Sequence, residues 1–197
     1  MIALSNRRED QMNKAELRRS LLQKRQSMSV EEWRQKSDRI CTHLQSGVLV
    51  TQSQTVLAYF SFRQEPDLSP LFTDTKHCWG LPRCVGKSLF WHTWKAGVPL
   101  QKGNYGILEP KPNATTLEPK DVNLILVPAV ACDQRGYRLG YGGGFYDRLL
   151  NSPEWDSIPT IGIVFEFAYI PQLPIDEWDK GLHSVCTETG FKRVEQI

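Results

Sequence analysis

The stretch NLILVPAVACDQRGYRLGYGGGFYDR (residues 123–148) joins the most strand-like run of the chain to its most glycine-rich segment. Residues 123–133 form an apolar run rich in aliphatic side chains, of the kind that is buried in a parallel sheet. Residues 138–148 contain four glycines among eleven positions, and a helical pattern begins near position 145. The stretch therefore predicts a strand that ends in a glycine loop, followed by a helix. In open α/β sheets, ligands bind at such a position.

The segments on either side of this stretch alternate between strands and helices. Two amphipathic helices are expected over 13–28 and 29–45. Asn13 and Ser29 can cap these helices, and a third, short helix is expected to begin at Pro66. Further apolar runs predict buried strands at 55–60, 77–83, 88–94, 160–166 and 184–188. Strands separated by helices predict an α/β fold, a single-domain three-layer sandwich whose mostly parallel sheet carries helices on both faces.

The bulk properties of the chain fit one globular unit. Its 197 residues suit a single α/β domain, expected over 13–197, with a disordered N-terminal extension at 1–12. The formal net charge is only +2, whereas nucleic-acid binders usually show a stronger and clustered basic excess. No run approaches the roughly 20 apolar residues that a membrane helix requires. The sequence therefore predicts neither a nucleic-acid nor a membrane partner, and we expect a monomer.

The cysteines indicate a reducing compartment. There are five of them, an odd number, and no CxxC pair occurs. Free thiols, together with the acidic residues within the first ten positions, predict a cytoplasmic protein without a targeting segment. The neighbouring histidines and cysteines match no common zinc spacing, so a zinc site is rejected. These residues are His77, Cys78, Cys84 and His92.

The glycine loop has the chemistry of a phosphate site. Glycines allow positive φ angles and let backbone N–H groups approach a ligand closely. The start of a helix adds free N–H groups, and Arg138 adds a fork of donors for phosphate oxygens. Asp147 falls in the first helical turn, where a carboxylate beside bound phosphates suits Mg²⁺. A glycine-rich turn whose charged residues are merely solvated is an equally good interpretation of the local pattern.

Two named phosphate-binding patterns do not apply to this chain. The dinucleotide fingerprint requires a glycine at position 145, where this chain has Phe145. The segment GLPRCVGKS (80–88) resembles a P-loop, but its glycines are one residue too far apart and Pro82 lies between them. The nature of the glycine loop therefore has to be judged from other parts of the chain.

Several segments together resemble the 5-formyltetrahydrofolate cyclo-ligase family, also called methenyltetrahydrofolate synthetases. LVPAVACDQRGYRLGYGGGFYDRLL (126–150) is similar to the family signature. Other similar segments follow in the expected order, namely KAELRRSLLQKRQSMS (14–29), YFSFRQEPDLSPLF (59–72), LPR (81–83), NYGILEP (104–110) and LPIDEWD (173–179). The resemblance extends from Lys14 to Thr187. It implies conversion of 5-formyltetrahydrofolate to 5,10-methenyltetrahydrofolate, with ATP as co-substrate, Mg²⁺ as cofactor, and release of ADP and phosphate.

The resemblance also implies the residues that bind the nucleotide and the metal. Lys14 and Arg18, one helical turn apart, would face the ATP phosphates. The rest of the nucleotide site would be Arg138, Leu139, Gly140, Tyr141, Gly142, Gly143, Gly144, Phe145 and Tyr146. Asp147 and Asp179 match the Mg²⁺ positions. On the residues alone, a solvated basic helix face is the better interpretation of Lys14 and Arg18. A surface carboxylate in an acidic loop is nearly as good an interpretation of Asp179.

The implied folate site is assembled from more distant parts of the chain. Glu65 matches the folate-binding carboxylate of the family, although on its own it could be a helix-entry charge before Pro66. Phe60, Tyr105 and Tyr146 would line the pocket for the pterin and the formyl group, and each is otherwise a plausible core aromatic. The implied catalytic residues are Lys14, Arg138 and Tyr146, and Arg83 is a weaker candidate for a phosphate contact. The implied partner is 5-formyltetrahydrofolate, with or without a polyglutamate tail.

The chain departs from the family pattern at three loop positions. Phe145 stands where many members have tyrosine, and Tyr141 and Gly143 occupy positions that are basic in some members. Fewer cations in the loop imply a lower affinity for ATP. Binding of the phosphates would then depend more on Lys14 and Arg138. Two other functions stay open, a non-catalytic relative that binds folate, nucleotide or RNA, and another phosphoryl-transfer enzyme on a similar fold.

Overall fold

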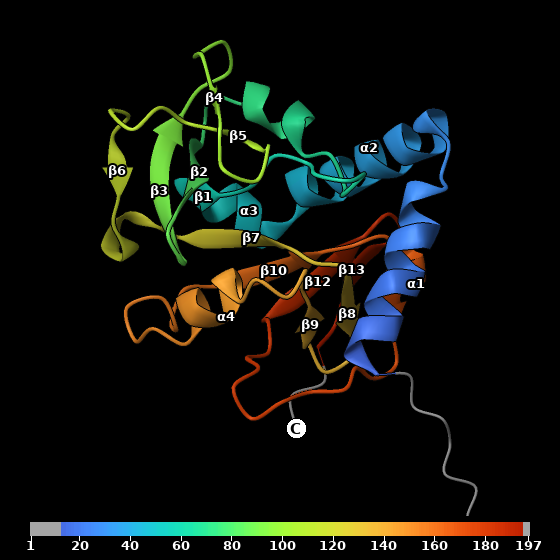
Figure 1. The fold of residues 1–197 in the computed structure, drawn as a ribbon. Helices are drawn as coiled ribbons and strands as arrows, with labels where there is room; N and C mark the ends of the chain where they lie inside the picture. Colours follow the sequence, from blue (N-terminus) through green and yellow to red (C-terminus); the bar gives the residue numbers. More distant parts are fainter. Residues whose placement is uncertain (1–12, 195–197) are drawn as a thin grey trace, which may run out of the picture.

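The computed structural model describes residues 13–194, so the extension expected at 1–12 lies outside the described residues. The α-helices are α1 (Lys14–Gln26), α2 (Val30–Ser46), α3 (Val48–Gln52) and α4 (Phe145–Leu150). The strands are β1 (Thr55–Leu57), β2 (Cys78–Val85), β3 (Ser88–Trp94), β4 (Gln101–Lys102), β5 (Leu108–Glu109), β6 (Thr116–Leu117), β7 (Leu124–Pro128), β8 (Ala131–Asp133), β9 (Arg138–Leu139), β10 (Thr160–Ile163), β11 (Tyr169–Ile170), β12 (Ser184–Thr187) and β13 (Gly190–Lys192). Short 3₁₀ helices occupy Ser69–Thr73, Pro119–Asp121 and Glu166–Ala168. Figure 1 shows how these elements are arranged.

An eight-stranded mixed sheet forms the centre of the fold. Its strand order is β13-β12-β10-β7-β1-β2-β3-β6, and the five inner strands from β12 to β2 run parallel. The outer strands β13, β3 and β6 pair antiparallel to their neighbours. The central strands β10, β7 and β1 are buried along nearly their whole length, which is why they appear as apolar runs in the sequence.

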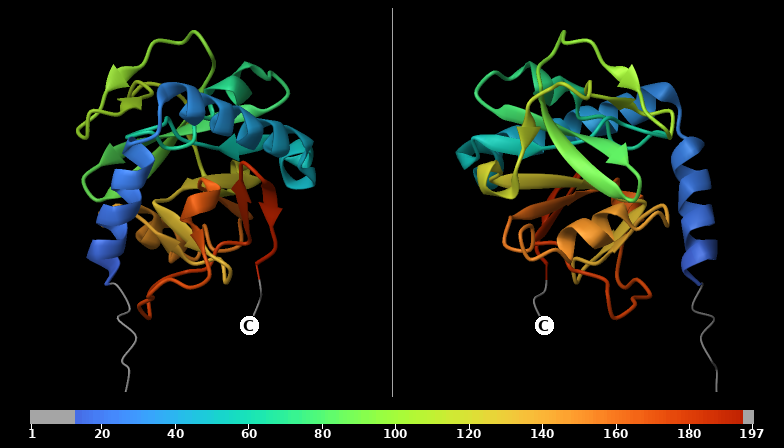
Figure 2. Two further views of the ribbon diagram at one scale, coloured as in Figure 1. Left: turned by 90° about the vertical axis from the view of Figure 1, so that its right-hand side faces the viewer. Right: turned by 60° about the vertical axis from the view of Figure 1, so that its left-hand side comes forward.

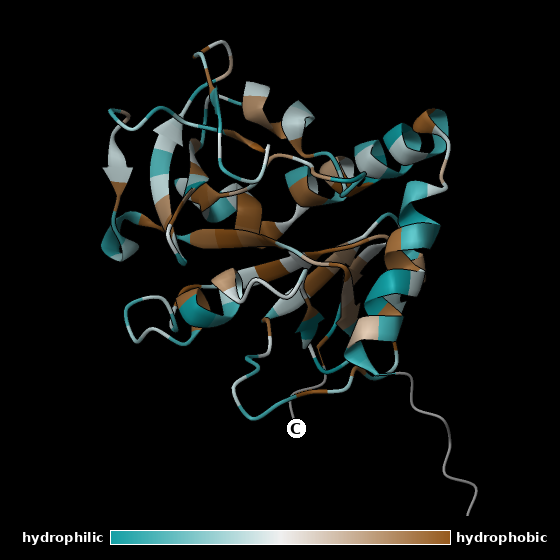
Figure 3. Ribbon diagram, viewed as in Figure 1, coloured by the Kyte–Doolittle hydropathy of each residue, from teal (hydrophilic) through white to brown (hydrophobic). Residues whose placement is uncertain are grey.

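Side chains of the central strand β7 alternate between two apolar cores. Leu124 and Leu126 pack with α2, α3 and the 3₁₀ helix at Ser69–Thr73. Ile125 and Val127 point to the opposite face and pack with α1 and α4. In Figure 3 the apolar residues concentrate in the sheet, whereas the outward faces of α1 and α2 are polar. The predicted mostly parallel α/β sandwich with helices on both faces is therefore confirmed.

The predicted strand over 123–133 is wrong in one respect, because the chain forms two strands there. β7 ends at Pro128, and the following β8 leaves the large sheet to pair with β9 and β11 in a three-stranded sheet. Every residue from Ala129 to Asp133 is buried in the same region of the core. The buried run therefore continues although the strand does not, and the one local sign of the break is Pro128, which cannot donate a ladder hydrogen bond.

Smaller differences concern the bounds and the number of the elements. The strand expected over 160–166 ends at Ile163. The strand expected over 55–60 ends at Leu57, and the helix expected from Pro66 is a 3₁₀ helix that begins at Ser69. The edge strand β13 was not anticipated. The long loop at 96–120 contains the β4–β5 hairpin and β6, and Figure 2 shows this segment at one end of the molecule. Within residues 13–194, no helix has both the length and the apolar character needed to cross a membrane.

Candidate active site at the glycine loop

The glycine loop connects β9 to α4. Gly142 and Gly144 have positive φ angles of 95° and 67°, a backbone region that favours glycine, and Gly144 is the N-cap of α4. α4 has only six residues, so its dipole contributes less positive charge than a full-length helix would. The loop thus supplies backbone N–H groups, while the charge for an anionic ligand comes from neighbouring arginine and lysine side chains.

Arg138 and Asp147 form an ion pair across the glycine loop. The Arg138 side chain is almost fully buried, and its guanidinium donates to the Asp147 carboxylate. It also donates to the carbonyl oxygen of Lys180 at 3.1 Å. This second bond brings the loop at 176–180 beside the glycine loop. Asn151 also connects α4 to the loop at 176–180. Its Nδ2 donates to the carbonyl oxygen of Asp147 at 2.8 Å and to that of Trp178 at 2.9 Å.

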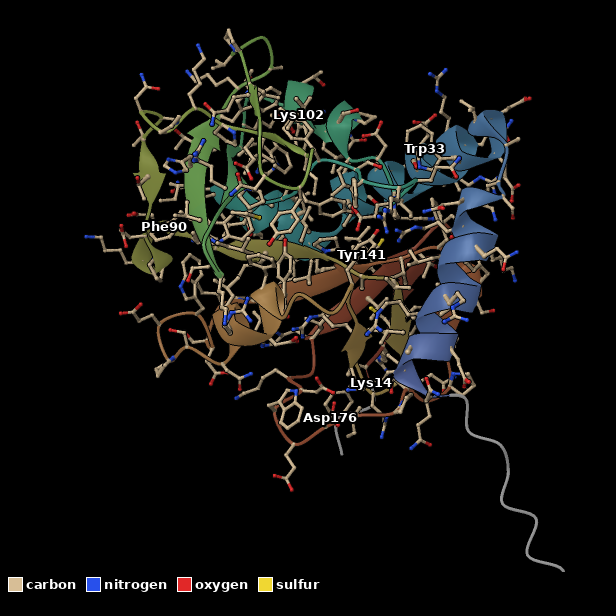
Figure 4. All side chains as sticks on the ribbon, viewed as in Figure 1. Lys14, Trp33, Phe90, Lys102, Tyr141 and Asp176 are labelled. Carbon is tan, nitrogen blue, oxygen red and sulfur yellow. The ribbon has the colours of Figure 1, made fainter. Side chains whose placement is uncertain are left out.

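Lys14, at the start of α1, contacts the loop at 176–180. Its Nζ lies 2.6 Å from Asp176 Oδ2 and 2.7 Å from Asp179 Oδ2 (Figure 4). Partial burial lowers the pKa of Lys14, but the hydrogen bonds and charges of the two aspartates more than offset this, so the pKa lies above its ordinary value. Lys14 is therefore a cation at neutral pH, and a phosphate could compete for it with the aspartates.

Two further arginines of α1 reach the glycine loop. Arg18 Nε donates to the carbonyl oxygen of Gly140 at 2.7 Å. Arg25 is buried and donates to the hydroxyl of Tyr141. Lys14, Arg18 and Arg25 are spaced by four and seven residues, so they lie on one stripe of the helix. α1 thus places three cations along one side of the site.

Glu65 lies in a turn after β1 and is 3% exposed. Its carboxylate accepts from the backbone N–H of Phe62 at 3.0 Å. Burial raises its pKa to about 7, while Arg25, the Phe62 N–H and the Tyr141 hydroxyl act in the opposite direction. Glu65 is therefore a buried carboxyl group that is poised to exchange a proton near neutral pH.

The predicted aromatic residues fall into separate groups. Tyr146 packs against Trp91, with ring centroids 6.4 Å apart. Tyr105 is 55% exposed and its ring meets Phe145 edge to face at 5.7 Å, which brings the 96–120 loop onto the start of α4. Phe60 instead packs edge to face with two aromatics of the core, and these are Phe72 and Trp94. The structure therefore brings Tyr105 and Phe145 together at the glycine loop, whereas Phe60 is part of an aromatic cluster.

The environment of Tyr146 keeps its phenol protonated. Burial raises its pKa, and the nearby Glu65 and Cys84 raise it further, although Arg138 opposes this. The phenol therefore keeps its proton at neutral pH and can donate a hydrogen bond.

Arg83, the weaker candidate for a phosphate contact, is engaged within the protein. Its Nη1 donates to the carbonyl oxygen of Pro110 at 2.6 Å and lies 4.0 Å from the Glu109 carboxylate.

The carboxylates partly fit the predicted Mg²⁺ site. Among residues 13–194, no three His, Cys, Asp or Glu side chains converge as a metal cluster. Asp147 and Asp179 each face a cation, Arg138 and Lys14 respectively. Mg²⁺ commonly takes only one or two carboxylates and completes its shell with waters and substrate phosphates. The donor set is therefore compatible with Mg²⁺ that arrives with a nucleotide, and the assignment stays a prediction.

Sequence reasoning missed two residues of this site. Arg25 was not singled out, although a charged residue on the stripe that also carries Leu21 was a signal that it could be buried. Asp176 was seen only as part of an acidic loop, yet it pairs with Lys14. No sequence pattern connects these residues, because 162 positions separate Lys14 from Asp176.

Known proteins are similar to this chain over nearly its whole length. The profile of the 5-formyltetrahydrofolate cyclo-ligase family matches residues 10–188. The 5-formyltetrahydrofolate cyclo-ligase of Mycolicibacterium smegmatis is 32% identical over 188 residues, which cover 89% of this chain and 93% of the relative. The protein of the same name from Escherichia coli K12 is 28% identical over 176 residues, or 84% of this chain and 94% of the relative.

A solved structure agrees with these relatives. The NMR structure of 5,10-methenyltetrahydrofolate synthetase from Aquifex aeolicus matches with a TM-score of 0.83 and 34% identity, and covers 93% of this chain and 94% of that one. The fold, the sequence signature and the near-complete coverage agree. This chain therefore belongs to the 5-formyltetrahydrofolate cyclo-ligase family of enzymes.

Proposed function

We propose that this protein converts 5-formyltetrahydrofolate to 5,10-methenyltetrahydrofolate, using ATP and Mg²⁺ and releasing ADP and phosphate. The observation that carries the proposal is that the Arg138–Asp147 pair at the glycine loop is bonded to the 176–180 loop, which holds Lys14, in a chain that belongs to this family. Such a site is cationic, rich in backbone N–H groups and furnished with carboxylates, as phosphoryl transfer requires.

The chemical difficulty of the reaction is that the formyl oxygen, which must leave when the ring closes, is a poor leaving group. Transfer of the γ-phosphoryl group to the formyl oxygen breaks the bond to ADP and makes that oxygen part of a phosphate ester. N10 then bonds to the formyl carbon and loses its proton, and the C–O bond breaks to release phosphate. Arg138 and Lys14 would hold the phosphates in position, which is the main protein contribution to reactions of this kind.

The remaining residues have supporting roles in this proposal. Asp147 and Asp179 would hold Mg²⁺, which when bound neutralises charge on the phosphates. Glu65 would accept hydrogen bonds from the amino and amide edge of the pterin, and Tyr146 would donate one near the formyl group. A monomeric state, a cytoplasmic location and acceptance of polyglutamylated folates stay predictions.

The reaction can be tested directly by following methenyltetrahydrofolate absorbance after mixing the protein with 5-formyltetrahydrofolate, ATP and Mg²⁺. We expect product only when all three components are present, with one ADP and one phosphate released per turnover. Turnover of 5-formyltetrahydrofolate without ATP would contradict the proposal, and so would the absence of turnover under every condition.

The role of Asp147 can be tested with the variant Asp147→Ala. We expect kcat to fall by about 10²-fold at a fixed, moderate Mg²⁺ concentration, because one electrostatic partner of the phosphates is lost. More Mg²⁺ should recover part of this activity. The matched control is Asp156→Ala, which removes an exposed carboxylate paired with Lys180 at 3.2 Å and should change kcat little. Equal loss in both variants, or wild-type Mg²⁺ dependence in Asp147→Ala, would contradict the assignment.

A further inference from the structure

Arg25 is a buried guanidinium that joins three loops of the candidate site. It is 3% exposed, and each of its nitrogens donates to a different loop. Nε donates to the carbonyl oxygen of Arg63 at 3.0 Å, and Nη1 to that of Ala129 at 3.3 Å. Nη2 donates to the Tyr141 hydroxyl. These loops follow β1, β7 and β9, so one side chain connects the ends of three strands.

The first of these loops has an unusual backbone. Arg63 and Gln64 both have positive φ angles, 48° and 55°, and neither is a glycine. L residues rarely adopt this region, and two in succession persist only where the surroundings hold them. The bond from Arg25 to the Arg63 carbonyl oxygen is one such restraint. The turn ends at Glu65, so the position of the Glu65 carboxylate depends on it.

Tyr141 connects this turn to the glycine loop. Its hydroxyl accepts from Arg25, interacts with the Glu65 carboxylate and lies 3.4 Å from the carbonyl oxygen of Phe62. Its ring meets the Phe62 ring at 5.9 Å and lies under the Arg25 guanidinium at 5.5 Å. Figure 4 shows Tyr141 near the middle of the molecule. One hydroxyl of the glycine loop therefore contacts both Arg25 and the turn that carries Glu65.

We propose that Arg25 and Tyr141 are positioning residues that couple nucleotide binding at the glycine loop to folate binding at Glu65. This inference rests on the proposed function, which assigns those two ligands to those two places. A nucleotide that fixes the glycine loop fixes Tyr141, and through Tyr141 and Arg25 it fixes the Phe62–Glu65 turn in its folate-binding form. Coupling of this kind is reciprocal, so folate tightens nucleotide binding by the same factor.

The coupling can be measured by calorimetry on the full chain. The dissociation constant of 5-formyltetrahydrofolate is determined alone and with saturating Mg²⁺ and an ATP analogue whose β–γ bridge is a methylene group. The proteins compared are wild type, Tyr141→Phe, Arg25→Lys and the control Tyr137→Phe. Tyr137 lies in the turn between β8 and β9, four residues before Tyr141, and its ring packs against the Arg135 guanidinium. The control thus removes a neighbouring tyrosine hydroxyl outside the network.

We expect the analogue to tighten folate binding at least about fivefold in wild type and in Tyr137→Phe, a usual size for coupling between sites. In Tyr141→Phe and Arg25→Lys this factor should fall to about one. Tyr141→Phe removes a single oxygen from a partly exposed side chain, so we expect this variant to fold. The coupling can therefore be measured in Tyr141→Phe even if Arg25→Lys folds poorly.

Two results would overturn the inference while leaving the proposed function intact. One is independent binding of the two ligands in wild type, and the other is full coupling in Tyr141→Phe. Failure of the proposed function looks different, because wild type would then form no methenyltetrahydrofolate in the ATP-dependent absorbance assay, whether or not the two ligands bind. A merely structural role for Tyr141 would weaken both single-ligand affinities and leave the coupling factor unchanged.

Discussion

Glu65 shows how much the surroundings of one residue decide its chemistry. Its carboxyl group interacts electrostatically with Arg25 and with three tyrosine hydroxyl groups, those of Tyr59, Tyr141 and Tyr146. Burial raises the pKa of Glu65 to about 7, and Arg25 limits the rise. Burial and the charge of Glu65 raise the pKa of each tyrosine, so the tyrosines stay protonated. Glu65 alone among these groups changes charge near neutral pH.

The pH dependence of folate capture follows from this pKa. The ionised carboxylate can accept two hydrogen bonds from a pterin edge, whereas the protonated acid cannot. Since the pKa is raised to about 7, the ionised fraction falls as the pH drops through that value. We expect kcat/KM for 5-formyltetrahydrofolate, at saturating Mg²⁺ and ATP, to fall tenfold for each unit of pH well below 7. This parameter reports ionisations of the enzyme before folate binds.

The variant Glu65→Gln provides the check on that assignment. Glutamine has nearly the same shape but no proton to exchange, so the acidic limb of the profile should vanish while the plateau drops. An acidic limb with the same midpoint in Glu65→Gln would assign the ionisation to another group.

At the residue scale, sequence reasoning identified side chains better than it identified their partners. Lys14 and Arg18 were expected on one helical face, and both reach the loops of the site. The resemblance pointed to Glu65, but its burial against Arg25 and Tyr141 arises from contacts between segments distant in the chain. Helical periodicity places Arg25 on the same stripe as Lys14, yet periodicity alone does not show that three loops close over it.

The glycine loop contains two glycines that differ in backbone conformation but not in the space around them. Gly142 has a φ of 95°, and a Cβ atom there would come no closer than 3.9 Å to any neighbour, the guanidinium of Arg18. Gly140 has no positive φ and would also have open space around a Cβ atom. The two positions therefore separate backbone strain from steric crowding.

We expect Gly142→Ala to lower the free energy of unfolding by about 1–2 kcal/mol, because the left-handed region costs an L residue about that much. Gly140→Ala should be neutral or stabilising by up to about 1 kcal/mol, since alanine reduces the entropy of the unfolded chain. Urea unfolding followed by circular dichroism measures both values. Equal effects at the two positions would show that backbone strain is not what selects glycine at 142.

Helix boundaries were easier to predict than strand boundaries, for a physical reason. Asn13 accepts from the N–H groups of Ala15 and Glu16, and the Glu16 carboxylate returns the contact, so the start of α1 is marked locally. Ser29 likewise caps α2 through the Glu32 N–H. The break between β7 and β8 has no such capping contact, and its one local sign is Pro128, which cannot donate a ladder hydrogen bond. Strand pairing, which decides the break, is set by distant segments.

At the scale of the whole molecule, the class of fold was predictable and the order of strands was not. Buried apolar strands separated by helices indicate a mostly parallel sheet, and this expectation is confirmed. The order β13-β12-β10-β7-β1-β2-β3-β6 depends on which strand edges meet, and the sequence pattern of each strand is similar. The short antiparallel edges β13 and β6 carry too few residues to show a pattern of their own.

The central strand β7 suggests that the two faces of the sheet unfold together. Leu126 and Ile125 are neighbours in sequence, both fully buried, and they belong to the apolar cores on opposite faces. We expect Leu126→Ala and Ile125→Ala each to lower the free energy of unfolding by about 2–5 kcal/mol. Both variants should keep a single transition whose midpoint is the same by tryptophan fluorescence and by far-ultraviolet circular dichroism, because β7 is shared by the two cores. Transitions that separate in one variant and not in the other would show that the faces fold as independent units and would contradict the single domain predicted over 13–197.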